Sequence, residues 1–194
     1  MNKAVLIAMQ PYYVFLIIAR AMGWDIPQNK TVEVRKDFPR DSAWNRAVHI
    51  YCSQNKKSFN RIPAKYQHLM AKLIGKVVGR FVCDSIRKGR ADNSAQAYCH
   101  NSPDETCLTD QELLLYANAG KPLYFWHIFE LKIYDTPKEL QEFRTITRCK
   151  DWQCFEACSD VCGYAENNQC RCGMVTKRII TAPQSWYYVE SINA

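Results

Sequence analysis

The run from residue 30 to residue 36 holds side chains that could bind a small polar ligand together. It reads K-T-V-E-V-R-K and follows the turn-prone segment Pro-Gln-Asn. Alternate side chains of a strand point to opposite faces, so Thr31, Glu33 and Arg35 share one face and the two valines share the other. Lys30 opens the strand, where its side chain can curl round the end. An ammonium, a carboxylate and a guanidinium at one strand end suit a planar polar ligand such as a nucleobase.

The same pattern also fits an ordinary solvated strand face with a weak Glu33–Arg35 ion pair, because exposed pairs contribute little. Trp126 and His127 are further candidates for ligand contact. They are neighbours in an aromatic-rich predicted strand. Alternation lets only one of them face a pocket, and the other would lie in the core.

Positive charge is concentrated in the middle of the chain. The formal net charge is +7, and between residues 50 and 90 ten basic side chains stand against one acidic side chain. Such a field suits a polyanion through phosphate contacts and counterion release, although the same lysines could serve solubility alone. The predicted nucleic-acid surface consists of Lys56, Lys57, Arg61, Lys65, Arg87, Lys88 and Arg90.

Six of the ten cysteines fall between residues 149 and 172. In a reducing compartment such crowding indicates zinc, because closely spaced thiolates can close a tetrahedral site without a large core. The alternative is a pair of disulfides, since a C-x-x-x-C run with a C-x-C run can staple a helix to a strand. Cys52 and Cys83 lie in apolar runs, where we expect buried core residues. The six clustered residues are Cys149, Cys154, Cys158, Cys162, Cys170 and Cys172.

The apolar segment from residue 4 to residue 23 does not fit a membrane span or a signal peptide. A span needs about 20 uninterrupted apolar residues, whereas Gln10 and Pro11 divide this run and Arg20 lies near its end. A strand over residues 3–9 followed by a helix with Pro11 in its first turn fits better. We therefore expect a soluble cytoplasmic protein without membrane association.

The remaining pattern predicts one α+β domain of 194 residues, and a hydrophobic content of 47% excludes wholesale disorder. Thr109 and Glu112 form the pattern of a helix capping box. The sheet is expected to curl or close. Strands are expected over residues 47–52, 75–86 (bent or bulged at Gly79), 123–134 and 183–190, helical segments over 64–74, 109–120 and 137–143, and a flexible loop over 88–106.

Several motifs in this order resemble ASCH-domain proteins, closest to the branch common in bacteriophages and their hosts. The resemblance covers nearly the whole chain and implies one ASCH/PUA-like domain over residues 1–194. Its implied fold is a small mixed β-barrel with flanking helices and a Cys-rich, zinc-stapled insertion over residues 144–173. The motifs are N-K-T-V-E-V-R-K, H-I-Y-C, G-K-V-V-G-R-F-V-C-D-S-I, L-T-D-Q-E-L, W-H-I-F-E-L-K-I-Y-D-T-P-K-E-L and P-Q-S-W-Y-Y-V-E.

The resemblance also implies site residues. Lys30, Glu33 and Arg35 meet the pattern G-x-K-x-x-E-x-R, with Gln28 in place of the glycine. The family is associated with nucleic acids and carries a pocket for a base or nucleoside. For the metal, the resemblance favours zinc, with Cys149, Cys154 and Cys158 at the family's first ligand-like positions. We choose Cys172 as the fourth ligand, with Cys162 and Cys170 as alternates.

Three functions follow as hypotheses. The first is a module that binds RNA, single-stranded DNA or a modified nucleoside through Lys30, Thr31, Glu33, Arg35, Trp126 or His127. The second is an amidohydrolase for N4-acetylcytidine-like nucleosides, in which Lys30 matches a family lysine, while Glu33 replaces the family threonine and would act as a base toward water. The third is a phage-type protein that binds and blocks a host factor.

Overall fold

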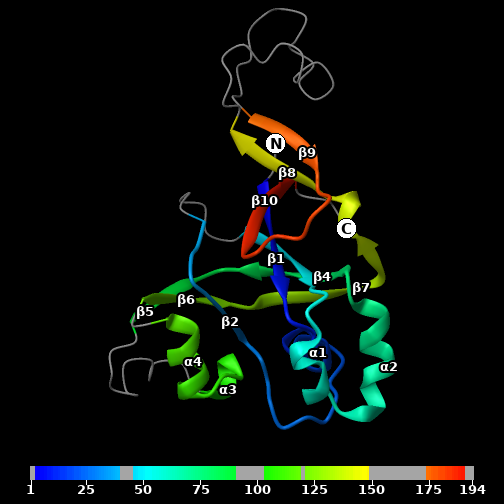
Figure 1. Cartoon of the computed structure of the whole chain (residues 1–194), viewed down its shortest axis with the longest axis vertical. Coiled ribbons are helices and arrows are strands. Elements are labelled where there is room, and N and C mark those ends of the chain that lie inside the picture. Colours follow the sequence, from blue (N-terminus) through cyan, green and yellow to red (C-terminus); the bar gives the residue numbers. More distant parts are fainter. Residues whose placement is uncertain (1–2, 40–45, 91–102, 119–120, 149–173, 191–194) are drawn as a thin grey trace, which may run out of the picture.

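The structure, a computed structural model, describes residues 3–39, 46–90, 103–118, 121–148 and 174–190 (Figure 1). The elements in chain order are β1 (Lys3–Met9), α1 (Pro11–Ala21), β2 (Val32–Arg35), β3 (Arg46–Cys52), η1 (Lys56–Arg61), α2 (Ala64–Leu73), β4 (Lys76–Cys83), β5 (Ile86–Arg90), α3 (Pro103–Thr106), α4 (Asp110–Ala117), β6 (Pro122–His127), β7 (Phe129–Glu139), η3 (Leu140–Glu142), β8 (Arg144–Arg148), β9 (Met174–Arg178) and β10 (Trp186–Glu190).

The strands form two sheets, which makes the fold α+β as predicted. The larger sheet has seven strands in the order β7-β4-β3-β1-β10-β8-β9, and the smaller has three in the order β2-β6-β5. β1 pairs with β3 in parallel and with β10 in antiparallel. The chain passes between the sheets four times, from β1 to β2, from β2 to β3, from β4 to β5 and from β6 to β7. Figure 1 shows α3 and α4 beside the small sheet and α2 toward the opposite side of the molecule.

The expected closed barrel is wrong for the described part of the chain. A barrel needs its two edge strands to pair, so that the sheet has no free edge. Here β7 and β9 end the large sheet, and β2, β6 and β5 form a separate sheet instead of closing it. The resulting architecture is a large open sheet with a small second sheet.

Two strand predictions fail at the points where the chain changes sheets. The sequence predicts one strand over residues 75–86, but β4 ends at Cys83 and β5 begins at Ile86. The segment 123–134 is likewise divided at Ile128. An apolar run continues across the second break, and the first break carries only the two polar residues Asp84 and Ser85, so composition alone does not mark a change of sheet. The expected loop 88–106 begins inside β5, and the expected helical turn 137–143 is reduced to η3 after β7.

Gly79 lies at the irregularity that the sequence predicts. The pairing of β4 with β7 shifts register between Val77 and Gly79. A Cβ atom on Gly79 would lie 2.5 Å from the backbone oxygen of Lys132 in the neighbouring strand. Glycine therefore lets the two backbones approach at the bulge.

Three apolar clusters hold the elements together. The largest joins α1 to one face of the large sheet through residues such as Phe15, Ile17 and Ile50, and Cys52 and Cys83 are buried in it as expected. A second cluster lies around Phe143. The third joins β2 and β6 to α4, and its buried residues are Val32, Val34, Leu113, Ala117, Leu123 and Phe125. This third cluster fixes β2 against α4, which positions the site described below.

Local sequence explains both helices near the site. α1 begins at Pro11, whose missing N–H is not needed in the first turn. α4 carries the predicted capping box, since the Thr109 side chain accepts from Glu112 N and Glu112 accepts from Thr109 N. No helix in the described ranges is long and apolar enough to cross a membrane.

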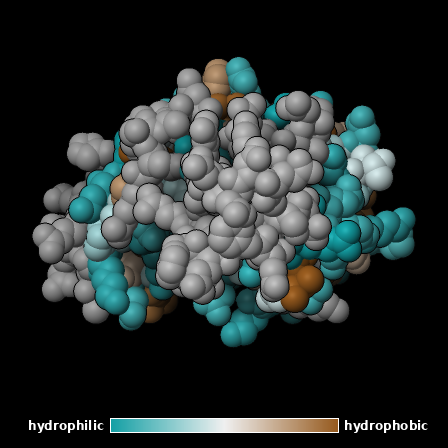
Figure 2. Space-filling model, turned by 90° about the horizontal axis from the view of Figure 1, so that it is seen from above, coloured by the Kyte–Doolittle hydropathy of each residue, from teal (hydrophilic) through white to brown (hydrophobic). Residues whose placement is uncertain are grey.

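Figure 2 views the molecule from the end that carries β8 and β9. The described side chains around the rim of this view are mostly hydrophilic, with isolated hydrophobic ones among them. The six clustered cysteines, and with them most of the predicted insertion 144–173, lie outside the described residues. Residues 144–148 of that segment form β8, which pairs with β9 and β10 in the large sheet.

Candidate functional site

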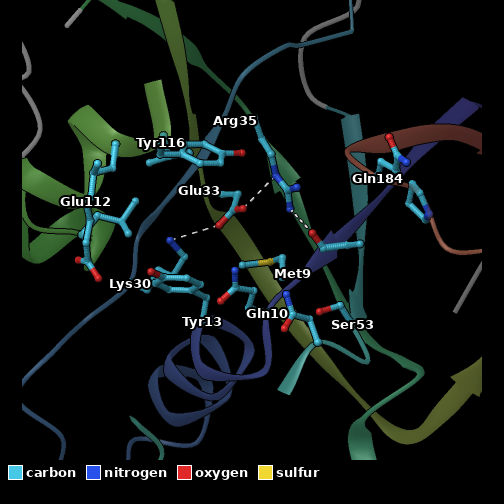
Figure 3. A pocket seen from close by; sticks show the side chains of 16 residues that line it. Met9, Gln10, Tyr13, Lys30, Glu33, Arg35, Ser53, Glu112, Tyr116 and Gln184 are labelled. Atoms are coloured by element: carbon cyan, nitrogen blue, oxygen red, sulfur yellow. Dashed lines mark hydrogen bonds and ion pairs between the residues drawn. The ribbon is translucent and has the colours of Figure 1, made fainter. Parts of the chain in front are cut away.

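A cavity of about 620 Å³ lies between β2 and α4 on one side and the ends of β1 and the start of α1 on the other (Figure 3). Its volume is in the range of small-molecule sites in proteins. The lining residues are Ala8, Met9, Gln10, Tyr13, Lys30, Glu33, Val34, Arg35, Ser53, Asn55, Leu108, Glu112, Leu115, Tyr116, Pro183 and Gln184.

Glu33 is the centre of the charged group in this cavity. Its Oε2 lies 3.2 Å from Lys30 Nζ, and its Oε1 lies 2.9 Å from Arg35 Nε. All three residues are buried, with exposed fractions of 1% for Lys30, 7% for Glu33 and 5% for Arg35. The sequence prediction that these three charges converge on one concavity therefore agrees with the geometry, and the solvated-face alternative does not.

Lys30 is held by three acceptors. Its Nζ donates to the backbone oxygen of Val32 at 2.8 Å and to that of Thr106 at 2.9 Å, and it forms an ion pair with Glu33. An ammonium has three N–H donors. Lys30 is therefore fully engaged by the protein, and its contact with Thr106 also ties β2 to α3.

Arg35 is anchored across the cavity to β1 and to the residue before β10. Its Nη2 donates to the backbone oxygen of Ala8 at 2.7 Å, and its Nη1 donates to that of Ser185 at 3.4 Å. Its Nε forms the ion pair with Glu33, but the Nε–H meets no hydrogen-bond acceptor in the described part of the chain. Ser53 Oγ, also at the cavity wall, is likewise buried without a partner among the described residues.

The alternation of β2 explains why the charges face the cavity. Val32 and Val34 belong to the cluster with α4, and β2 is buried along its whole length. Glu33 and Arg35 therefore project to the other face, toward β1 and α1. Thr31 does not line the cavity, and its backbone bonds to Glu105 and Ile128.

Two tyrosines form walls of the cavity. In Figure 3, Tyr13 from α1 and Tyr116 from α4 lie on either side of Glu33. Burial and then the Glu112 carboxylate raise the pKa of Tyr13 to about 12. Burial also raises the pKa of Tyr116. Both rings stay neutral at ordinary pH and offer flat faces to a ligand.

The predicted aromatic contacts Trp126 and His127 do not line this cavity. Trp126 is 1% exposed and packs in the core beside α1. His127 Nδ1 lies 2.7 Å from Asp84 Oδ1 at the junction of β4 and β5. In the small sheet, Trp126 of the middle strand β6 pairs directly with Glu33 of β2. Its ring nevertheless belongs to the core cluster and does not border the cavity.

The predicted basic surface is divided between separate elements. Lys56, Lys57 and Arg61 belong to η1, Lys65 follows on α2, and Arg87, Lys88 and Arg90 belong to β5. β5 and α2 lie at opposite sides of the molecule in Figure 1. Arg61, from this set, forms an ion pair with the cavity-lining residue Glu112. Its Nη1 lies 3.0 Å from Glu112 Oε1.

Sequence reasoning missed several cavity residues, above all Tyr13, Tyr116 and Gln184. Tyr13 was visible only as part of a helical segment, and Tyr116 only as a residue of the capped helix. No spacing links them to residue 33, since they come from three distant parts of the chain. Glu112 was predicted as a capping residue, and the same carboxylate also lines the cavity.

Within the described ranges, no group of three or more His, Cys, Asp or Glu side chains could hold a metal ion. The predicted zinc ligands Cys149, Cys154, Cys158 and Cys172, and the alternates Cys162 and Cys170, lie outside those ranges. Zinc binding by this segment stays a prediction.

No protein-family model matches the chain, and no curated protein sequence matches it. Among solved structures, the chain is similar to a serine-to-alanine variant of the ASCH protein from Zymomonas mobilis. The TM-score is 0.52 at 14% identity, over 94% of this chain and 85% of that one. The unsubstituted ASCH protein from Zymomonas mobilis gives a TM-score of 0.48 at 16% identity, over 71% and 73% of the two chains. The first likeness shows an ASCH-like fold.

Proposed function

We propose that the cavity binds a nucleobase, either of a nucleic acid or of a modified nucleoside. The observation that carries the proposal is Glu33, a carboxylate held between Lys30 and Arg35 inside a cavity of about 620 Å³. Its two cationic neighbours compensate its charge and fix its orientation. The ASCH-like fold supports the proposal as analogy at the level of the fold.

The arrangement favours a ligand that donates hydrogen bonds. Each carboxylate oxygen has about two acceptor sites, and each Glu33 oxygen uses one of them on a cation. The remaining sites suit the amino or ring N–H groups of a base.

The tyrosine walls suit the flat faces of the same ligand. Stacking of a base on an aromatic side chain contributes about 1–3 kcal/mol. Tyr13 and Tyr116 lie on two sides of Glu33, so a base that hydrogen-bonds to the carboxylate comes against aromatic surface. The combination matches base recognition by an edge contact and a face contact.

Lys30 supports binding over the hydrolase alternative. A lysine that acts as a base or nucleophile must release a proton and turn its nitrogen toward the substrate. Here the Lys30 ammonium donates to two backbone oxygens and lies against Glu33. Its contacts are those of a residue that orients Glu33 and closes the strand end.

The test is a calorimetric titration of the purified chain with cytidine, adenosine, guanosine and uridine. We expect saturable binding of at least one base that carries an amino group, and weaker binding of uridine. Absence of binding to all four nucleosides, and to short single-stranded RNA and DNA containing them, would overturn the proposal.

Two variants connect the binding to this cavity. Tyr116→Leu keeps apolar volume but removes a stacking face, so affinity should fall about tenfold. Tyr66→Leu is the matched control, because Tyr66 stacks on Trp24 beside α2 rather than lining the cavity. Equal affinities for the two variants would place the ligand elsewhere. Acetate release from N4-acetylcytidine, absent in Lys30→Gln, would favour the hydrolase instead.

A further inference from the structure

Two exposed cations lie over the tyrosines at the cavity. The guanidinium carbon of Arg61 is 4.1 Å from the ring centroid of Tyr12 and 5.9 Å from that of Tyr13. Lys36 Nζ is 4.8 Å from the ring centroid of Tyr116. Each of the two aromatic walls is therefore contacted by an exposed positive charge.

The two cations come from different directions. Arg61 ends η1, next to α1, whereas Lys36 follows directly after β2. Tyr13 and Tyr116 lie on either side of Glu33 in Figure 3, so the charges that contact them flank the cavity. Arg61 also pairs with Glu112, and its side chain is still 41% exposed.

These cations differ from the two inside the cavity. Lys30 and Arg35 are buried and hold backbone oxygens and Glu33. Lys36 is exposed, and Arg61 is exposed while retaining part of its fork of donors for an incoming group. The interior charges orient an acceptor for a base, whereas the two exposed charges contact the tyrosine walls without lining the cavity themselves.

We propose that the cavity takes a nucleoside phosphate, with the base at Glu33 and phosphate groups at Arg61 and Lys36. This inference rests on the proposed base binding and names its ligand class more narrowly. Cations on two sides of the cavity suit the two phosphates that flank one residue of a single strand. Arginine binds phosphate oxygens through its planar fork, and lysine binds them as a point charge.

The competing explanation is structural, because a cation over a tyrosine ring can simply brace the ring. The two explanations differ in what they predict for ligands of different charge. If the cation only braces the ring, its loss should weaken nucleoside and nucleotide binding equally, since both ligands need the tyrosine wall. If the cation contacts phosphate, its loss should weaken binding of the phosphorylated ligand only.

The experiment compares cytidine, adenosine and guanosine with their 3′,5′-bisphosphates by calorimetry at low salt. We expect each bisphosphate to bind more tightly than its nucleoside, by about fivefold for each phosphate contact. Arg61→Gln and Lys36→Gln should each weaken bisphosphate binding by about fivefold. Both variants should bind each nucleoside within about twofold of the affinity of the unsubstituted protein. The difference in affinity between bisphosphate and nucleoside should shrink as the salt concentration rises.

Arg144→Gln and Lys132→Gln are matched controls, since both remove an exposed charge from strands that do not line the cavity. Equal affinity for nucleoside and bisphosphate would overturn this inference and leave base binding intact. Equal losses for both ligands in Arg61→Gln would identify a brace, and equal losses in the controls would identify a general charge effect. Either result would overturn it. Failure of every nucleoside and bisphosphate to bind would overturn the proposed function as well.

Discussion

Two groups of buried polar side chains lie in different parts of this protein. One is the charged group of Lys30, Glu33 and Arg35, which borders a cavity. The other is the pair of His49 and Tyr134, joined at 2.7 Å between His49 Nδ1 and Tyr134 Oη. His49 is fully buried, and Phe143 packs edge-on against its ring.

The difference shows what a buried polar group needs in order to serve a ligand. Two cations lie against the Glu33 carboxylate and compensate its charge, and the cavity leaves room for a further partner. His49 has no such compensation: burial, and then Arg80 and Lys138, lower its pKa to about 4. It is therefore neutral at ordinary pH and forms part of the core.

The largest effect should come from breaking the charged group. Glu33→Gln keeps the size of the side chain but leaves two buried cations without a counter-charge. We expect the free energy of unfolding to fall by about 3–5 kcal/mol, measured by urea denaturation. Glu139→Gln is the control, since Glu139 pairs with Lys76 at the surface and its loss should cost less than about 1 kcal/mol. Similar values for both variants would contradict the buried network.

The His49 pair should make the fold sensitive to acid. Unfolded histidine has a pKa of about 6.5, whereas the folded value is about 4. Between these values the unfolded state binds more protons, so stability falls as pH falls from about 6.5 to 4. The shift corresponds to about 3 kcal/mol in total. Urea denaturation at several pH values measures it, and His49→Gln should lose this part of the slope. An unchanged slope in that variant would refute the assignment.

Removing the partner of His49 should have a smaller effect. Tyr134→Phe leaves one buried imidazole nitrogen without its hydrogen bond, which should lower stability at pH 7 by about 1–3 kcal/mol. Tyr187→Phe, at a half-buried tyrosine of β10, serves as the control. Thermal unfolding of both variants gives the comparison. An equal change in the two would show that the hydrogen bond contributes nothing specific.

The smallest effect should come from the exposed pair at the cavity. Arg61→Gln removes the ion pair with Glu112, whose two side chains are 41% and 35% exposed. We expect stability to change by less than about 1 kcal/mol, even though phosphate-dependent binding falls. Thermal unfolding of the same preparation used for calorimetry checks this. A large loss of stability would mean that Arg61 holds η1 and α4 together.

Local pattern predicted the elements that the site depends on. β1 spans residues 3–9 as expected, α1 begins at Pro11, and the α4 capping box forms. These features follow from alternation, a fixed proline φ and side-chain capping, all of which act within a few residues. The breaks at Asp84–Ser85 and at Ile128 were missed because sheet changes depend on strands that are distant in sequence.

The sequence by itself determined that Glu33 and Arg35 share one face of a strand whose other face is apolar, and that Lys30 can reach them. Tertiary structure alone decided that this face borders a cavity walled by Tyr13 and Tyr116, and that Trp126 turns into the core. The reason is physical. Alternation along a strand is fixed by backbone geometry, whereas the neighbours of each face depend on how α1 and α4 pack against it.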